Sequence, residues 1–108
     1  MTEKVIRDGR VAVLISPGYG GGWSTWCEDN NQREAALFDR RFVEAAEAGV
    51  EDIEPIAKEV FGEGAYFFCG GWCDIKIEWV PVKTRFRVEE YDGSERLRTM
   101  DGYDFFVA

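Results

Sequence analysis

Hydrophobic residues along the chain occur first as a continuous run, then at helical spacing, and finally in alternation with polar residues. The continuous run is VAVLI at residues 11–15, which follows an Asp-Gly turn at 8–9 and ends before Ser16-Pro17. A short apolar run between turn residues is typical of a strand that is buried on both faces. The pattern therefore predicts a central strand near the start of the chain.

Apolar residues recur at helical spacing in two segments near the middle of the chain. Asp39 is typical of a helix N-cap and Gly49 of a left-handed C-terminal cap, so we predict a helix over 39–49. A second helix is predicted over 52–62, because Pro55 is tolerated in a first helical turn and an apolar stripe surrounds it. The stripe is formed by Ile53, Ile56, Ala57, Val60 and Phe61.

From Ala65 onward the period changes to two, which predicts antiparallel strands. Residues 75–80 alternate between apolar and mostly charged side chains and end at Pro81, which indicates a half-buried strand. A last short strand is predicted over 103–107. A chain of 108 residues has room for one core. We therefore predict a single α+β domain over 1–108, an antiparallel β-meander sheet with two helices packed on one face.

A tight hairpin is predicted where an Asp-Gly turn at 92–93 joins residues 86–91 to residues 94–99. A two-residue turn fixes the register, so one face of the hairpin is apolar and directed at the core while the other is charged. The register pairs Phe86 with Thr99, Arg87 with Arg98, Val88 with Leu97, Glu89 with Arg96, and Tyr91 with Ser94.

Four arginines share the charged face of this hairpin: Arg85, Arg87, Arg96 and Arg98. Like charges directly opposite each other are unfavourable across a strand pair, so the cluster calls for an explanation. In one interpretation the arginines bind an anion, such as a phosphate or a carboxylate. In the other they are neutralised in a solvated lattice by nearby carboxylates, namely Glu78, Glu89, Glu90 and Glu95.

A glycine-rich segment with two tryptophans, SPGYGGGWSTW at residues 16–26, follows the predicted central strand. Consecutive glycines let backbone N–H groups converge on an anion, which makes Gly20, Gly21 and Ser24 candidate anion ligands, although the Lys-Ser/Thr ending of a P-loop is missing. Alternatively, the glycines allow a close approach between backbones and the tryptophans fill the edge of the core. A third possibility is a surface that binds a partner. Its candidate residues are Tyr19, Trp23, Trp26 and Trp72.

The sequence Gly-Gly-Trp occurs twice, at 21–23 and 70–72, and both copies would form one rim if they lie at the same end of the sheet. The second copy lies between Cys69 and Cys73, and Cys27 is the remaining cysteine. Closed zinc sites use four nitrogen or sulfur ligands, so we predict small thiols without a metal or cofactor. An odd cysteine count, without an apolar leader or a long apolar run, predicts the cytoplasm of the host cell.

The chain carries 13 basic and 21 acidic residues, a net charge of −8, and no histidine. The acidic balance disfavours direct binding of nucleic acid or of an anionic membrane. Histidine is the commonest general base, and a carboxylate beside arginines, such as Glu89 beside Arg87, has a lowered pKa and is a poor base near neutral pH. We therefore predict a binding protein without catalytic residues.

Three segments of the chain, VAVLISPGYGGGWSTW, LFDRRFVEAAEAG and IEWVPVKTRFRVEEYDGSE, together carry a resemblance. The chain resembles a family of small phage and prophage proteins with an SPGxGxGWSTW loop, over nearly its whole length. It departs at Arg40, where a proline after the helix cap would be typical, and at the three cysteines. The resemblance implies a phage setting, in which accessory proteins block host defences by stoichiometric binding, and it implies no catalytic residues.

These observations predict two alternative functions. In the first, a phage-type accessory protein binds and inhibits a host defence factor, or another host or phage protein, through an acidic surface that bears tryptophans. In the second, the protein is a sponge that sequesters an anionic nucleotide signal with the arginine cluster and the glycine-rich loop. The last strand, with Phe105-Phe106, could also pair across a two-fold axis and form a homodimer.

Overall fold

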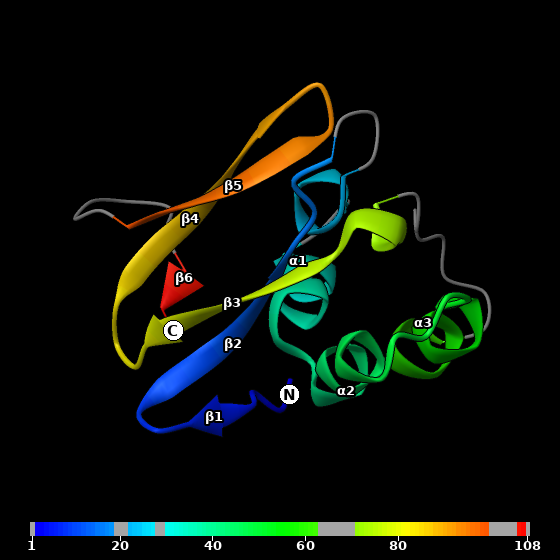
Figure 1. Ribbon diagram of the computed structural model, residues 1–108, viewed down its shortest axis with the longest axis horizontal. Helices are drawn as coiled ribbons and strands as arrows, with labels where there is room; N and C mark the ends of the chain where they lie inside the picture. Colours follow the sequence, from blue (N-terminus) through cyan, green and yellow to red (C-terminus); the bar gives the residue numbers. More distant parts are fainter. Residues whose placement is uncertain (1, 19–21, 28–29, 63–70, 100–105, 108) are drawn as a thin grey trace.

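The computed structural model describes residues 2–18, 22–27, 30–62, 71–99 and 106–107, and Figure 1 shows how their elements are arranged. The class is mixed α+β with antiparallel strands, as predicted. In chain order the elements are β1 (Ile6–Arg7), β2 (Arg10–Ile15), the 3-10 turn η1 (Ser24–Trp26), α1 (Asn30–Phe38), α2 (Arg40–Ala48), α3 (Glu54–Phe61), the 3-10 turn η2 (Trp72–Asp74), β3 (Lys76–Pro81), β4 (Arg85–Tyr91), β5 (Ser94–Thr99) and β6 (Phe106–Val107).

The described strands form two antiparallel sheets, in the orders β1-β2-β3 and β5-β4-β6. We predicted a single meander, and the difference arises at the connection between β3 and β4. There Lys83 has a φ of +71°, and the amide of Thr84 donates to the carbonyl oxygen of Pro81 at 3.1 Å. This tight turn sends the chain out of the first sheet, so that β4 begins a second sheet with β5 and β6. Of the last predicted strand, residues 103–105 lie outside the described residues.

Strand β2 is the central strand of the first sheet, and its residues from Val11 to Ile15 are buried, as predicted for an apolar run. Its two faces belong to different hydrophobic clusters. Ala12 and Leu14 join the first core, which also contains Trp23, Phe42 and Trp72. The alternate residues Val11, Val13 and Ile15 join the second core, together with Leu37, Phe38, Val80 and Phe86. Figure 1 shows α2 and α3 on one side of β2 and the β4–β5 hairpin on the other.

The two predicted helices are present, and both caps predicted for the first of them are confirmed. Helix α2 has Asp39 as its N-cap, and Gly49 at its C-terminal end has a φ of +72°. Helix α3 begins at Glu54, two residues after the predicted start, with Pro55 in its first turn. Helix α1, over 30–38, was not predicted. Its buried residues are the four consecutive positions Ala35, Ala36, Leu37 and Phe38, which give no helical period.

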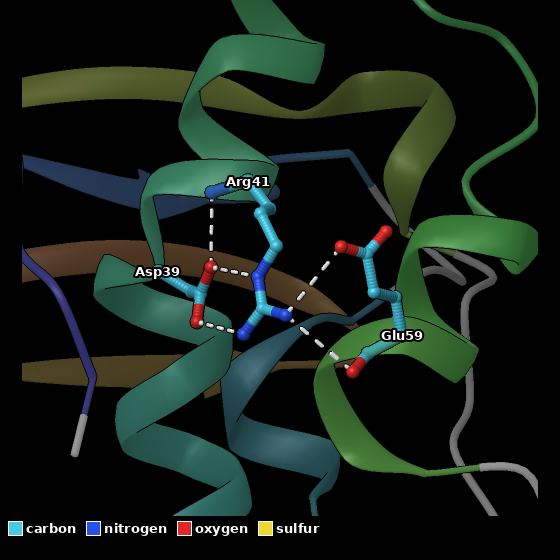
Figure 2. Close-up of polar contacts among 3 residues, drawn as sticks. All are labelled: Asp39, Arg41 and Glu59. Carbon is cyan, nitrogen blue, oxygen red and sulfur yellow. Dashed lines mark hydrogen bonds and ion pairs between the residues drawn. The ribbon is translucent and has the colours of Figure 1, made fainter.

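The start of α2 is tied to α3 by a polar contact among Asp39, Arg41 and Glu59 (Figure 2). The buried Asp39 carboxylate accepts hydrogen bonds from the Arg41 amide at 2.9 Å and from the guanidinium Nε and Nη2 at 3.0 and 3.1 Å. Arg41 Nη1 lies 3.8 Å from the carboxylate of Glu59, and the hydrogen bond from Asp39 raises the pKa of Arg41. The ion pair links α2 to α3, and the capping hydrogen bond of Asp39 explains why α2 begins at Arg40.

The β4–β5 hairpin has the predicted register at every described pair, including Arg87 opposite Arg98 and Tyr91 opposite Ser94. Its turn residues Asp92 and Gly93 have φ values of +51° and +84°, the left-handed conformation that a two-residue hairpin turn requires. The same conformation occurs in the Asp-Gly turn at 8–9, which joins β1 to β2. That turn was predicted, but the two-residue strand before it was not.

Candidate functional site

The glycine–tryptophan loop after β2 is held by one buried carboxylate, that of Glu95 at the start of β5. Glu95 is only 1% exposed. Its Oε1 accepts a hydrogen bond from the Ser16 amide at 3.0 Å. Its Oε2 accepts hydrogen bonds from the amides of Trp23 and Thr25 at 2.8 and 3.0 Å and from the Thr25 hydroxyl at 2.6 Å. The Glu95 amide in turn donates to the Ser16 carbonyl oxygen at 2.8 Å.

This arrangement changes the interpretation of the loop. Converging backbone amides were predicted there as ligands for an external anion, but those of the described residues bind a carboxylate of the same chain. Removing a carboxylate from water costs several kcal/mol, and charge-assisted hydrogen bonds from several donors offset that cost. The prediction that Glu95 neutralises the hairpin arginines is therefore wrong, because its side chain points into the molecule instead.

The described parts of the two Gly-Gly-Trp copies, residues 22–23 and 71–72, lie against each other, as expected if both are at one end of the sheet. A Cβ atom added at Gly71 would overlap the carbonyl oxygen of Gly22, so the two backbones approach as closely as glycine allows. The Ser16 hydroxyl donates to the Gly71 carbonyl oxygen at 2.7 Å, and the rings of Trp23 and Trp72 have centroids 5.4 Å apart. The close backbone approach considered from the sequence is thus present.

Trp23 and Trp72 are core residues, so their predicted role as contacts for a partner is wrong. The Trp23 indole N–H donates to the carbonyl oxygen of Ala36 at 2.6 Å, and that of Trp72 to the carbonyl oxygen of Val50 at 2.7 Å. These bonds satisfy both indoles inside the first core. Ser24 is also buried, which removes it as a ligand for an anion in solvent. Tyr19, Gly20 and Gly21 lie outside the described residues.

Trp26 differs from these two tryptophans because 43% of its surface is exposed. One face of its ring covers the backbone of Gly22, where an added Cβ would lie 2.7 Å from the indole. Its indole Nε1 donates to Glu90 Oε2 at 3.3 Å, and the same oxygen accepts a hydrogen bond from the Gly93 amide at 3.0 Å. Trp26 is thereby fixed beside the turn of the β4–β5 hairpin.

The arginine cluster is partly neutralised by Glu89. The Glu89 carboxylate lies 2.8 Å from Arg87 Nη2 and 3.2 Å from Arg98 Nη1, so it bridges the two arginines that face each other across the hairpin. The hydrogen bond from Arg87, and then that from Arg98, lowers the pKa of Glu89. This contact supports the lattice interpretation for Arg87 and Arg98. Arg96 is exposed and makes no ion pair within the described part of the chain, and Arg85 is exposed at the far end of β4.

A shallow hollow of about 390 Å³ lies at the turn end of the hairpin and is lined by Glu89, Glu90, Tyr91, Ser94 and Arg96. Tyr91 is 78% exposed, and the hydroxyl of Ser94 donates to the Pro17 carbonyl oxygen at 2.7 Å, which fixes the hairpin turn on the loop. We call Trp26, Glu90, Tyr91 and Arg96 the tip surface. It combines two exposed aromatic rings with one carboxylate and one guanidinium that make no ion pair among the described residues.

A larger open groove of about 1000 Å³ lies along the N-terminal segment and the helices, with Lys4, Asn31, Asp39, Arg41 and Phe61 in its lining. Three of the charged groups in its lining already have partners within the chain, because Arg41 binds Asp39 and the Lys4 ammonium lies 4.5 Å from the centre of the Phe38 ring. The tip surface is therefore the stronger candidate site.

Comparison with protein-family models, with curated proteins and with solved structures finds no match for this chain. The resemblance to phage proteins accordingly stays a prediction, and the assignment of the site rests on its geometry. Among the described residues, no group of three or more Cys, Asp or Glu side chains is placed to hold a metal ion. None of the helices within the described ranges has the length and apolar character needed to cross a membrane.

Proposed function

We propose that this protein acts by binding another protein through the tip surface, without catalysing a reaction. The observation that carries the proposal is the exposure of Trp26 and Tyr91 beside Glu90 and Arg96 at one end of the molecule. Tryptophan, tyrosine and arginine are the residues most enriched among those that dominate the free energy of protein association. Tyr91 and Arg96 line the hollow with Glu90, and Trp26 contacts Glu90 from the core-facing side of the hairpin. The end of the hairpin therefore presents all three residue types, which favours an interface.

Two residues of the tip surface, Trp26 and Glu90, are held in place before any partner arrives, which supports the same proposal. Trp26 is fixed by the Gly22 backbone and by Glu90, and Glu90 is fixed by the amide of Gly93. A side chain that is already ordered loses less conformational entropy on binding, at a saving of about 0.5–1.5 kcal/mol for each such group. Such ordering lowers the cost of binding a partner, whereas a surface that only contacts solvent gains nothing from it.

The chemistry of the tip surface indicates what the partner presents. Glu90 is complementary to a lysine or arginine, and Arg96 to an aspartate or glutamate, so the partner segment carries both charges. The net charge of −8 speeds encounter with a basic surface. Together with the resemblance to phage proteins, these features favour an inhibitor of a host defence factor.

Capture of an anionic nucleotide, the alternative function, has less support from the geometry. The loop amides of the described residues bind Glu95, and Glu89 engages both Arg87 and Arg98. A phosphate in the hollow beside Arg96 would also face the carboxylates of Glu89 and Glu90. Like-charge contacts of this kind disfavour an anion.

The test is affinity capture from lysate of the cells in which the protein is expressed, with matched variants. Tyr91→Ala and Arg96→Ala change the tip surface, whereas Ile6→Ala and Val82→Ala remove side chains that are 56% and 39% exposed near the 8–9 turn, at the opposite end of β2. We expect the double tip variant to lose a protein that the double control variant retains. The affinity measured with that purified protein should fall by about 30-fold or more, equivalent to about 2 kcal/mol.

Equal recovery of every co-purified protein with the tip and control variants would contradict the proposal. Thermal unfolding with cyclic nucleotides and ADP-ribose tests the alternative, because a ligand at a thousandfold excess over its Kd raises stability by about 4 kcal/mol. A rise that disappears in Arg96→Ala would favour the nucleotide, and an absent rise would favour the protein partner.

A further inference from the structure

We propose that the loop after β2 forms a carboxylate-binding site and that Glu95 is its resident ligand. The site consists of the backbone N–H groups of Ser16, Trp23 and Thr25 and the hydroxyl of Thr25, which we call the amide cradle. All four donors lie 2.6–3.0 Å from a carboxylate oxygen of Glu95. The donors come from the loop and the ligand comes from β5, which is remote in sequence.

The amide cradle has the features of a built anion site. An ionised carboxylate can only accept hydrogen bonds, and all four of these groups donate to it. Within the described residues no arginine or lysine pairs with Glu95, so its charge is stabilised by backbone dipoles and a hydroxyl. This is the means by which glycine-rich loops bind phosphate, and here it serves a carboxylate.

The geometry of the amide cradle selects a small carboxylate. One donor addresses Oε1 and three address Oε2, which matches an anion with two oxygens. Replacing Glu95 by alanine removes Cγ and the carboxyl group, which together correspond in size and charge to one acetate ion. Because the residue is buried, the vacated space would be enclosed and lined by the four donors. Acetate is therefore the ligand expected to replace the missing side chain.

Glu95 is also a positioning residue for the tip surface, and this second part rests on the proposed function. Thr25 gives both its amide and its hydroxyl to Glu95, and the next residue is Trp26. The carboxylate thus holds the 3-10 turn η1 against the hairpin, where the Trp26 indole reaches Glu90. Emptying the amide cradle should release Trp26 as well as destabilise the fold.

The experiment compares Glu95→Ala with Leu97→Ala, an inward-facing residue of the same strand. Thermal unfolding is followed in sodium acetate, and in sodium chloride or acetamide at the same concentration. Since four donors lose their acceptor, two of them buried and two part-buried, we expect the Tm of Glu95→Ala to fall by about 10 °C or more in chloride. Acetate should raise it progressively with concentration, as a ligand of the folded state does, and acetamide should not.

Leu97→Ala should be destabilised and should respond to acetate no more than the wild type does. If acetate raises the Tm of Glu95→Ala by no more than that of Leu97→Ala, the site does not bind carboxylates and the proposal is overturned. Because Glu95→Ala could fail to fold, Glu95→Gln provides a second variant. It fills the same space but places an N–H donor against the cradle, so it should be destabilised and should not be rescued by acetate. Wild-type stability of Glu95→Gln would also overturn the proposal.

Amide hydrogen exchange of the wild-type protein gives a readout that needs no variant. We expect the amides of Trp23 and Thr25, although they lie outside the strands and α-helices, to exchange as slowly as those of β2. Exchange at the rate of an open loop would contradict a filled cradle. The two proposals can fail separately. If acetate stabilises Glu95→Ala but the tip variants bind every partner normally, the carboxylate site is supported and the proposed function is contradicted.

Discussion

At the scale of single residues, Gly71 and Gly49 show that two glycines can be required for different physical reasons. Gly71 has a φ of −82°, which any residue adopts, but a Cβ there would overlap the Gly22 carbonyl oxygen and lie 2.8 Å from Ser16 Oγ. Gly49 has a φ of +72° and no atom within 4 Å of the position of a Cβ. The first glycine is needed for space and the second for conformation.

We predict that Gly71→Ala lowers the free energy of unfolding by about 3 kcal/mol, because the backbones of two loops must separate to admit one methyl group. Gly49→Ala should cost only about 1–2 kcal/mol, the ordinary cost of a left-handed residue with a side chain. Urea denaturation of both variants provides the comparison. Equal losses would mean that the backbones at Gly22 and Gly71 are not in close contact.

Glu95 shows how far the candidate site could be predicted from the sequence. The two-residue period of the hairpin places Glu95 on the same face as Leu97, so a charged residue was already directed at the core. That inward position is a signal in the sequence against grouping Glu95 with the carboxylates that neutralise the arginines. Its acceptor role was beyond prediction, because its donors lie 70 to 79 residues away in the chain. Only the tertiary fold brings them together.

At the scale of secondary-structure elements, an element marked by a local sequence signal was predicted, and an element buried between two cores was not. The Asp-Gly turn set the register of β4 and β5 because both strands are adjacent in sequence. Helix α1 was missed because it lies between the two cores: Ala36 belongs to the first, and Leu37 and Phe38 belong to the second. A helix that is buried on two sides has no single apolar stripe, and the helical period on which its prediction depends is lost.

The N-terminus of α2 offers an element-scale prediction, because the Asp39 side chain both caps the helix and binds Arg41 (Figure 2). We expect Asp39→Ala to lower the free energy of unfolding by about 2 kcal/mol, since the cap and the partner of a guanidinium are both lost. Asp39→Asn keeps a side-chain oxygen that accepts the hydrogen bond from the Arg41 amide, so its free energy of unfolding should fall by about half as much.

Glu59→Gln is the matched control for this prediction, because the Glu59 side chain is 66% exposed and ion pairs at such positions contribute less than about 1 kcal/mol. Urea denaturation at neutral pH measures all three variants. If Asp39→Ala were as stable as Glu59→Gln, the cap would not hold the helix start, and the contact between α2 and α3 would be a surface ion pair of little consequence.

At the scale of the whole molecule, strand β2 is the wall shared by the two cores. Leu14 packs in the core with Trp23 and Trp72, and Val13 packs on the opposite face with Phe86. The apolar run predicted that both faces of β2 are buried, but it could not indicate what covers each face. That the hairpin forms a second sheet over β2 follows from the turn at Lys83, where a residue other than glycine adopts a positive φ and no sequence signal marks the change of sheet.

This shared wall predicts that the two cores unfold together. Leu14→Ala should lower the free energy of unfolding by about 2–5 kcal/mol and Val13→Ala by about 2 kcal/mol, because each leaves a cavity on its own face of β2. Tryptophan fluorescence reports mainly on the first core, where Trp23 and Trp72 lie, and far-UV circular dichroism reports on all elements. We expect both probes to give one common urea transition in each variant. A Val13→Ala protein whose fluorescence transition stays at the wild-type urea concentration would show that the hairpin side unfolds independently, because the lesion on one face of β2 would then not reach the tryptophans on the other.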